Sequence, residues 1–521
     1  MRFSSIFSYA KDDFKRFIHL INNKNYSFRA TLINPKRLFI DLQKSAILEL
    51  DIEDNVYNPF LSGNIVIDNT ENVIERFKTD PSLTEFGDQN VFQGYRTRGD
   101  GRDILLLSIL PIDGGENSYN LGSDSFNAIF GLQAMFVLTD EEDLTAETGK
   151  SKRYRIEDFD LQILREKKIF FSSVSLLGKS VDVSNLTDSE KSVQTGKIIK
   201  EILKKGLLND EIIYTEKVNG VETTPHFEDG SSTLFYSSPA SSSALDDLSF
   251  IHSLHVSDGD SKDFAFLNKT QYTGEYTLES ASSIFKKSFN KKQDSGGQYF
   301  IENFTMAGQR DVNNIIQNDA KKPADALEFG ETGDIIDVKF FNPPGGEYQN
   351  KLKTTLVHAY HFQGKTFIID GVSGNIENVK DDFTELYVDP MKGKDGPKPY
   401  FLINNTQKTN LNYDNVFTVF DQDNDFIRLS SGRNKMLSDA LKLNLGVELT
   451  VQGGLHRHAG KFISIDRTGS YIENDFDSKF MGIYFILSVQ HIFVKDTTYL
   501  NKIVAVKTYS FTDLKNEEDI A

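Results

Sequence analysis

The sequence predicts a mainly β protein with α+β insertions, and three features of the chain lead to this fold class. Two blocks, residues 41–140 and 334–511, contain repeated apolar runs rich in Val, Ile, Phe and Tyr, residue types that suit a half-buried pleated surface. The segment between the blocks changes to a mixture of helical and strand periodicity. Strand-rich blocks without intervening helices are typical of antiparallel barrels or sandwiches.

Composition narrows the class of protein further. The chain has 521 residues, enough for about three or four domains, and a formal net charge of −18, which opposes nucleic-acid binding because phosphate contacts need clustered Lys and Arg. Cysteine is absent, which excludes disulfides, thiol catalysis and thiolate metal sites. No signal peptide is visible, and the longest apolar run, Phe480–Val489, is too short for a membrane-spanning helix. We therefore expect a soluble protein made in the cytoplasm.

The N-terminal segment predicts a short amphipathic helix over residues 11–21. Phe14, Phe17, Ile18 and Ile21 recur there at helical spacing. Such a helix suits an arm that docks on its own chain or on a neighbouring subunit, and docking on its own chain is favoured.

The first strand-rich block contains four predicted strand regions. A turn is expected at Asn58-Pro59, and Gly131 is a candidate β-bulge inside the last region. A polar, charged boundary follows at residues 139–153. The predicted strand regions are 46–52, 63–68, 104–110 and 126–138.

The middle segment predicts helices as well as strands. Residues 155–171 are expected to contain a strand that ends at Ile169–Phe171, and residues 195–205 form a helix that Gly206 ends. Ser243 and Asp246 have the spacing of a capping box at the start of a helix that continues to His255. Short strands are expected at 264–267 and 275–278, and residues 286–333 are polar and irregular.

The second strand-rich block begins near residue 334. A weakly periodic region at 386–436 interrupts it, with a Pro/Gly/Lys loop at 389–399. The strands on both sides of this region are rich in β-branched and aromatic residues. They are predicted at 335–341, 351–362, 365–370, 447–451, 462–465, 480–494 and 503–511.

Residue patterns that carry chemistry are weak or incomplete. The run Asp421–Gly432 begins like a calcium loop but has Phe426 where that loop needs Gly, and Gly432 where it needs Glu. Two histidine pairs fail as metal sites, because one pair points to opposite faces of its strand and the other has no third ligand nearby. Two glycine clusters fail as phosphate-binding loops, because they lack the Gly-Lys-Ser/Thr ending and a following helix. The histidine pairs are His358 with His361 and His456 with His458, and the glycine clusters are at Gly99–Gly101 and Gly114–Gly115. We therefore predict no catalytic, cofactor-binding or metal-binding residues and no enzymatic activity.

Three ordered stretches resemble one family. Ile52–Asp68 is similar to its opening hairpin, Asn342–Asp370 to its Gly-Tyr-led strand pair, and Phe462–Phe511 to its closing strands. The closing pattern consists of Gly482, Tyr484, Ser488, Val489, His491 and Tyr499. The stretches resemble the central baseplate hub protein of contractile-tailed phages of the T-even type, a fold shared with type VI secretion spike proteins. For His491 itself, a hydrogen-bonded residue of the barrel is favoured over any functional role.

The resemblance implies two tail-tube-type antiparallel β-barrel domains and a mixed accessory domain. The expected division is an N-terminal arm (1–40), a first barrel (41–150), the accessory domain (151–333) and a second barrel (334–521) with an inserted loop region at about 386–436. It also implies a homotrimer whose six barrels join a six-fold tail tube to a three-fold spike, with the spike on a separate chain and other baseplate proteins as further partners. The virion tail baseplate would be its location, after assembly in the host cytoplasm.

The resemblance further implies that the hub forms part of the DNA ejection channel. The acidic balance fits this role, since negatively charged walls would let DNA pass through the lumen of the channel without specific binding. Two other functions stay open. A virion carbohydrate- or receptor-binding β-protein would need an exposed aromatic platform, and the absence of Trp counts against it. A tail-associated cell-wall hydrolase would need two carboxylates with separated pKa values in one cleft, and the sequence nominates none.

Overall fold

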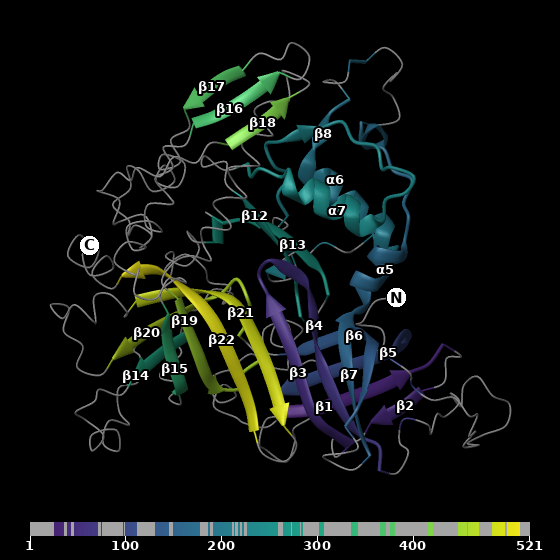
Figure 1. The fold of residues 1–521 in the computed structure, drawn as a ribbon, viewed down its shortest axis with the longest axis vertical. Coiled ribbons are helices and arrows are strands. Elements are labelled where there is room, and N and C mark those ends of the chain that lie inside the picture. The colour runs from purple at the N-terminus through teal and green to yellow at the C-terminus, as the bar shows by residue number, and fades with distance from the viewer. Residues whose placement is uncertain are drawn as a thin grey trace.

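A computed structural model of the chain shows a mainly β protein with two β lobes side by side and a module containing helices above them (Figure 1). The described residues are 26–35, 39–42, 46–70, 74, 97, 99–111, 131–144, 150–177, 186–187, 191–210, 213, 217–218, 221–222, 227–258, 264–271, 274–281, 283–284, 302–306, 335–341, 365–370, 376–380, 415–419, 446–455, 457–467, 482–494 and 498–510. Among them, no helix combines the length and apolar character needed to cross a membrane.

One continuous curled sheet of 13 strands runs through both lobes, in the order β2-β1-β5-β6-β7-β4-β3-β21-β22-β19-β15, with β20 attached to β21 and β14 attached to β20. The neighbours pair antiparallel, except that β14 is parallel to β20. The strands are β1 (Tyr26–Ile33), β2 (Phe39–Leu42), β3 (Ile47–Asn55), β4 (Asn58–Asp68), β5 (Asp100–Pro111), β6 (Leu132–Asp143), β7 (Ser151–Asp158), β14 (Glu302–Met306), β15 (Ile335–Phe341), β19 (Gly446–Gln452), β20 (Phe462–Arg467), β21 (Gly482–Val494) and β22 (Thr498–Ser510).

The first lobe consists of β1–β7 and curls around its own apolar core. Side chains alternate along each strand, so Leu50 and Ile52 of β3 point inward while Glu49 and Glu53 are exposed. Burying one such aliphatic side chain contributes about 1.5–3 kcal/mol. The core is formed mainly by Leu32, Leu50, Ile52, Ile65, Ile67, Leu105, Leu107, Phe136, Leu138, Tyr154 and Ile156.

The second lobe consists of β14, β15 and β19–β22 and has a separate core. The strand β14 also contacts β15, so the six strands curl almost into a closed ring. Tyr484 and Phe304 are the largest side chains that are fully buried in this core. Its other members are Val447, Leu449, Val451, Ile463, Ile465, Ile486, Val489, Ile503 and Ala505.

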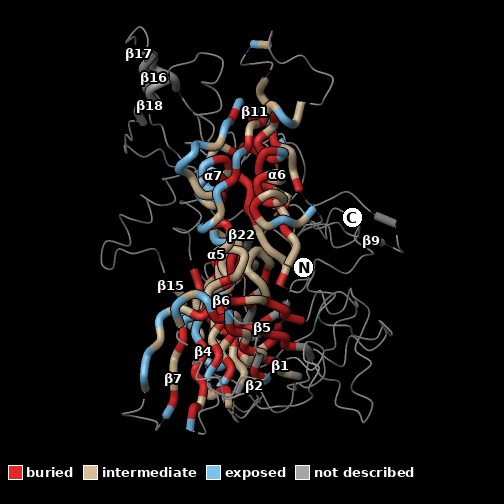
Figure 2. Tube along the Cα trace, turned by 90° about the vertical axis from the view of Figure 1, so that its right-hand side faces the viewer, coloured by how far each residue is buried: buried red, intermediate tan, exposed pale blue. Residues whose placement is uncertain are grey.

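The module above the lobes packs three helices on short strands around a third apolar core (Figures 1 and 2). The helix α7 (Ala244–Ser253) starts with a capping box, in which Ser243 and Asp246 each bond the other's backbone N–H. The other elements are α5 (Phe159–Glu166), the 3-10 turn η5 (Ser173–Leu176), α6 (Thr195–Leu207) and the strand pairs β8 (Val193–Gln194) with β11 (Thr233–Leu234), β9 (Lys217–Val218) with β10 (Val221–Glu222), and β12 (Ala265–Lys269) with β13 (Tyr276–Ser280). A separate three-stranded sheet contains β16 (Lys365–Asp370), β17 (Ile376–Lys380) and β18 (Asn415–Val419).

Most strands predicted from the sequence in the described residues are present. The predictions at 46–52, 63–68, 104–110, 264–267, 275–278, 335–341, 365–370, 447–451, 462–465, 480–494 and 503–511 correspond to β3, β4, β5, β12, β13, β15, β16, β19, β20, β21 and β22. The predicted region 126–138 becomes β6, which starts after Gly131 and continues to Asp143. The helix at 11–21 and the strand at 351–362 lie outside the described residues.

Two local predictions in the module are wrong. Residues 159–166 form the helix α5 and not a strand, because Asp158 caps it by accepting a hydrogen bond from the Asp160 N–H (2.9 Å). Gly206 does not end α6 but lies buried inside it, where a Cβ would stand 2.5 Å from Leu164 Cδ2. The helix ends instead at Leu207, and its C-cap residue Leu208 takes a left-handed conformation with φ 53°.

Three stretches contain strands where the sequence predicts none. The strands β1 and β2 lie partly or wholly in the expected arm and pair with each other, and β1 also pairs with β5. The strand β14 lies in the region expected to be irregular, and β18 lies in the expected inserted loop. Both are short strands whose parallel partners, β20 and β16, are distant in sequence, so local periodicity does not reveal them.

Candidate structural site at the junction of the lobes

The two lobes are joined through one edge of β21. Residues 482–485 of this edge pair with β20 of the second lobe, and residues 488–494 pair with β3 of the first lobe. Between them, the Ile486 carbonyl accepts from the Gly460 N–H and the Leu487 carbonyl accepts from the Val56 N–H, both at 2.9 Å. The sheet therefore passes from one lobe to the other without a gap in backbone hydrogen bonding.

A buried polar network lies on the inward face of β21 and β22, where the two cores meet. His491 is fully buried, and its Nδ1 lies 2.8 Å from both Tyr499 Oη and Asn501 Nδ2. Along β21, Val489 precedes it in the core of the second lobe, and Phe493 follows it in the core of the first. The network thus marks the boundary between two apolar cores on a single strand.

Asn501 extends this network to the connection between β19 and β20. Its Oδ1 accepts hydrogen bonds from the Gly454 N–H (2.6 Å) and from Arg457 Nη1 (2.7 Å). Arg457 also donates to the Gln452 carbonyl, and its guanidinium lies 5.4 Å from the centre of the Phe304 ring. Asn501 and Arg457 are both buried, so these bonds form in a medium of low polarity, where they are strong and costly to break.

Tyr499 fixes the geometry on the first-lobe side. Its ring stacks on Phe493 with 4.0 Å between centroids and 11° between planes. The same ring occupies the space above Gly453, where a Cβ would lie 2.2 Å from the ring, and the Gly453 N–H donates to the Tyr499 carbonyl (2.7 Å). Only glycine therefore fits at position 453.

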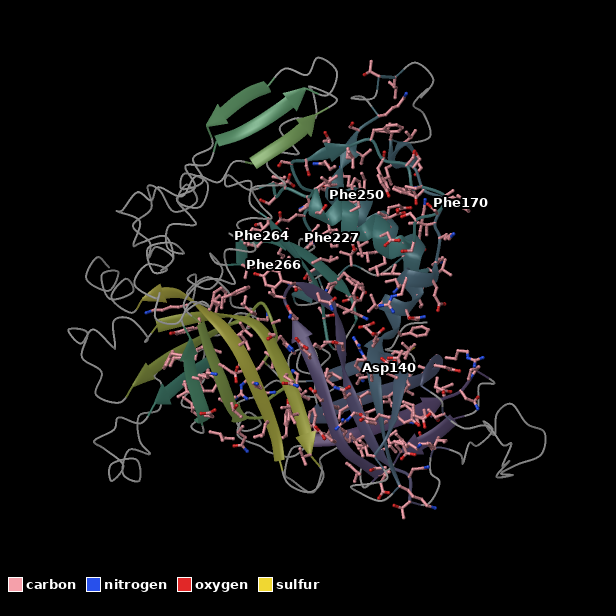
Figure 3. All side chains as sticks on the ribbon, viewed as in Figure 1. Asp140, Phe170, Phe227, Phe250, Phe264 and Phe266 are labelled. Atoms are coloured by element: carbon pink, nitrogen blue, oxygen red, sulfur yellow. The ribbon has the colours of Figure 1, made fainter. Side chains whose placement is uncertain are left out.

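The hairpin β12–β13 of the module contacts both lobes at the junction. Phe266 of β12 lies 6.0 Å from Tyr57, in the turn between β3 and β4, and 5.7 Å from Phe485 of β21. Phe264 packs against Phe266, with 5.1 Å between the ring centroids. Figure 3 shows both side chains above the strands of the second lobe. One aromatic side chain of the module thus bridges the two lobes.

Asp54 has hydrogen-bond partners in the module and in the second lobe. Asp54 Oδ2 accepts hydrogen bonds from the Ala459 N–H (2.9 Å) and from Gln271 Nε2 (2.8 Å), and His458 Nδ1 lies 4.0 Å away. Burial raises the pKa of Asp54 to about 6, more than its hydrogen bonds lower it. The backbone carbonyl of Gln271 in turn accepts a hydrogen bond from the backbone N–H of Gln133 in β6 (2.8 Å). Asp54 therefore connects the first lobe, the second lobe and the module.

A buried ion cluster attaches the hairpin to the end of β7. Lys269 Nζ lies 2.7 and 2.8 Å from the two oxygens of Asp158 and 2.7 Å from Asp160 Oδ2, to which Tyr276 also donates (3.1 Å). Burial alone would lower the pKa of Lys269, but the charges of Asp158 and Asp160 outweigh it and raise that pKa. The ammonium group therefore stays charged over the ordinary pH range.

The structure brings the sequence-derived closing pattern together at the junction. Gly482 starts β21 with φ 148°, Ser488 is the first β21 residue that pairs with β3, and His491 and Tyr499 form the boundary network. The interpretation of His491 as a hydrogen-bonded residue of the sheet is confirmed. Sequence reasoning missed Asp54, Gln271, Arg457 and Asn501. A usable signal for Asn501 was a short polar side chain in a strand otherwise rich in apolar residues.

The weak candidates for chemistry do not form a site in the described residues. His458 lies near Asp54, whereas His358, His361 and His456 lie outside the described part of the chain, as does Asp421–Gly432. Within the residues that the structure describes, no group of three or more His, Asp or Glu side chains could hold a metal ion.

No family model matches the chain, and no curated protein matches it in sequence. Solved structures do match. A tail protein from Neisseria meningitidis MC58 is 7% identical (93% of this chain, 96% of that one, TM-score 0.44), and the 43 kDa tail protein of prophage MuSo2 from Shewanella oneidensis is 9% identical (92% and 98%, TM-score 0.40). The E. coli c3393 protein, described as a type VI secretion component similar to the T4 bacteriophage tail proteins gp27 and gp5, is 8% identical (93% and 76%, TM-score 0.33).

Proposed function

We propose that this chain is a structural subunit of a contractile-tail baseplate hub, joining the tail tube to the central spike. One observation carries the proposal: a single sheet holds two curled lobes side by side, each around its own core. Three such chains present six lobes. A ring of this kind can meet a six-fold tube on one side and a three-fold spike on the other.

The ends of the sheet support assembly into a ring. The described pairings leave β2 and β15 as the terminal strands of the sheet path. On β15, Ile336 is 59% exposed, although the strand is rich in apolar residues. Strand edges are normally covered or paired. Within the chain, β14 already contacts β15, so contact with neighbouring subunits would cover the edge of β2 and the exposed Ile336 side chain.

An acidic channel fits the same role. Glu49, Asp51 and Glu53 alternate along β3 and share the face opposite to the core. With the net charge of −18, a lumen lined by such side chains would repel phosphate, so DNA would slide through it without specific binding. A lumen lined mainly by Lys and Arg would contradict this assignment.

The role we propose is geometric and involves no catalysis. The subunit would act in the virion baseplate after assembly in the host cytoplasm, with a homotrimer as its working form. Its partners would be the tube protein, a spike on a separate chain and other baseplate proteins. The buried network at the junction suits this role, since it fixes the angle between the lobes.

Native mass spectrometry of the purified chain tests the proposal. We expect a trimer, alone or after addition of a candidate spike protein, and we expect the trimer to nucleate polymerisation of the tube protein. A strict monomer under all of these conditions would overturn the proposal. Release of soluble fragments from peptidoglycan by the purified chain would favour a hydrolase instead.

A further inference from the structure

Asp54 is the one carboxylate described above at which three separately packed parts of the molecule meet. It belongs to β3 of the first lobe. Ala459, in the connection between β19 and β20, and Gln271, next to the hairpin strand β12, both donate hydrogen bonds to its Oδ2. A change in this carboxyl group therefore acts on all three parts at once.

The Gln271 amide is only half satisfied. Its side chain is buried, with 6% exposed, and its Nε2 donates to Asp54. Its Oε1 is also buried but has no hydrogen-bond partner. An ionised Asp54 only accepts hydrogen bonds, so it cannot supply the missing donor.

A protonated carboxyl group has the donor that the amide lacks. With a proton from solvent on Oδ1, Asp54 would donate to Gln271 Oε1 while its Oδ2 still accepts from Nε2. We propose that Asp54 and Gln271 form a proton-operated latch, in which the neutral acid–amide pair fastens the module and the second lobe to the first, and ionisation loosens them. The latch acts within one chain, whatever assembly that chain enters.

The surroundings of Asp54 favour the neutral acid. Burial raises its pKa to about 6, and the charge of Glu53 on the same strand acts in the same direction. His458 faces it at 4.0 Å from the connection between β19 and β20. The neighbouring strands present no titratable side chain in register beside it, and the hairpin presents the neutral Gln271. Val489 on β21 is in register with Asp54, and Ser62 and Asn58 on β4 pair with its neighbours Glu53 and Asn55.

Hydrogen exchange of the full chain, read by mass spectrometry at pH 5 and pH 8 and corrected for intrinsic rates, tests the latch. The reporters are peptides containing Ala459 and Gln133, whose N–H groups are bonded at the junction. We expect local opening there to increase about tenfold from pH 5 to pH 8, because opening returns the Asp54 pKa from about 6 to about 3.9. Amides of α6 report global unfolding, and their exchange should not follow the pH dependence of the two reporter peptides.

Substitutions separate the latch from its neighbours. Asp54→Asn supplies a permanent neutral acceptor and donor, so protection at the reporters should be high and equal at both pH values. Gln271→Met should lose the extra protection at pH 5. His458→Gln should keep the wild-type response, and so should Asp51→Asn, a control on the same strand whose carboxylate bonds Gln490. Equal wild-type protection at both pH values, or an unchanged response in Asp54→Asn, would overturn the proposal.

Discussion

Val489 and Phe493 lie on the same inward face of β21, but Val489 belongs to the core of the second lobe and Phe493 to the core of the first. Only His491 stands between them on that face, and it is bonded to Tyr499 and Asn501 of the neighbouring strand. The two lobes are thus distinguished by a polar network within a continuous sheet, and no linker separates them. The predictions below test this arrangement.

Asn501→Ala should destabilise the protein by about 3 kcal/mol or more. The change removes the acceptor that the Gly454 N–H and Arg457 Nη1 share. Arg457 keeps its bond to the Gln452 carbonyl but loses a charge-assisted hydrogen bond inside the protein, where such a loss is costly. Urea denaturation followed by circular dichroism measures the free energy of unfolding.

Lys502→Ala is the matched control for this change, because Lys502 is the next residue on β22 and forms an exposed ion pair with Glu448 (3.2 Å). Its loss should cost at most about 1 kcal/mol. Equal effects of the two substitutions would show that the junction network contributes no more than a surface pair.

Two substitutions near the end of α6 should act in opposite directions. Gly206→Ala should destabilise the protein by about 1–3 kcal/mol despite the better helix propensity of Ala, because the new Cβ meets Leu164. Leu208→Gly should stabilise it by up to about 1 kcal/mol, since the side chain is 81% exposed and the backbone is left-handed. Thermal unfolding of both variants gives the comparison, and a stable Gly206→Ala variant would contradict the packing of α6 on α5.

Lys269→Met should destabilise the protein by about 3–5 kcal/mol, because it leaves Asp158 buried without its counter-ion. Arg153→Ala, which breaks an exposed pair with Glu142, should cost less than about 1 kcal/mol. Limited proteolysis adds a local readout, since the Lys269→Met chain should be cut first around the hairpin β12–β13. Unchanged proteolysis there would argue against the hairpin being held by the ion cluster.

Acid should destabilise the module through His255. This side chain is buried, with Thr195 Oγ1 3.0 Å from its Nδ1, and burial lowers its pKa to about 3 from its ordinary value near 6.5. The unfolded chain therefore binds a proton that the folded chain excludes, so this contribution to stability is complete above about pH 6.5 and is lost as the pH falls toward 3.

His255→Asn should flatten this acid limb in a pH series of unfolding free energies. Asp54 acts with the opposite sign, because its raised pKa makes the folded state less stable as the pH rises from about 4 to about 6. A pH series on His255→Asn and on Asp54→Asn therefore separates the contribution of His255 to the unfolding free energy from that of Asp54. An acid limb identical in His255→Asn and wild type would contradict the assignment to His255.

The sequence made local elements predictable but not the pairing between distant ones. The strands around Phe462–Phe511 and the capping box at Ser243 have short-range signals and are present where we predicted them. The pairing of β21 with β3 joins residues that are distant in the chain, and nothing in either strand identifies the other.

The polar residues of the junction show the same limit. His491 stood out through its motif, but Asp54 looks in sequence like any acidic residue on an exposed face. Its role depends on Ala459 and Gln271, which only the folded chain brings to it. The helix α5 was missed because its short amphipathic run, next to the buried Ile169 and Phe171, also fits the end of a strand.

The pairing of β3 with β21 has a consequence during synthesis. The strand β3 leaves the ribosome long before β21, its partner along Glu49–Asn55, which is completed only at Val494. For that time the nascent first lobe presents an uncovered strand edge next to apolar side chains, the situation in which intermolecular pairing and aggregation begin. Solubility on expression should therefore depend on the time between the synthesis of β3 and the synthesis of β21. Truncated chains that end before β21 should precipitate or require chaperones.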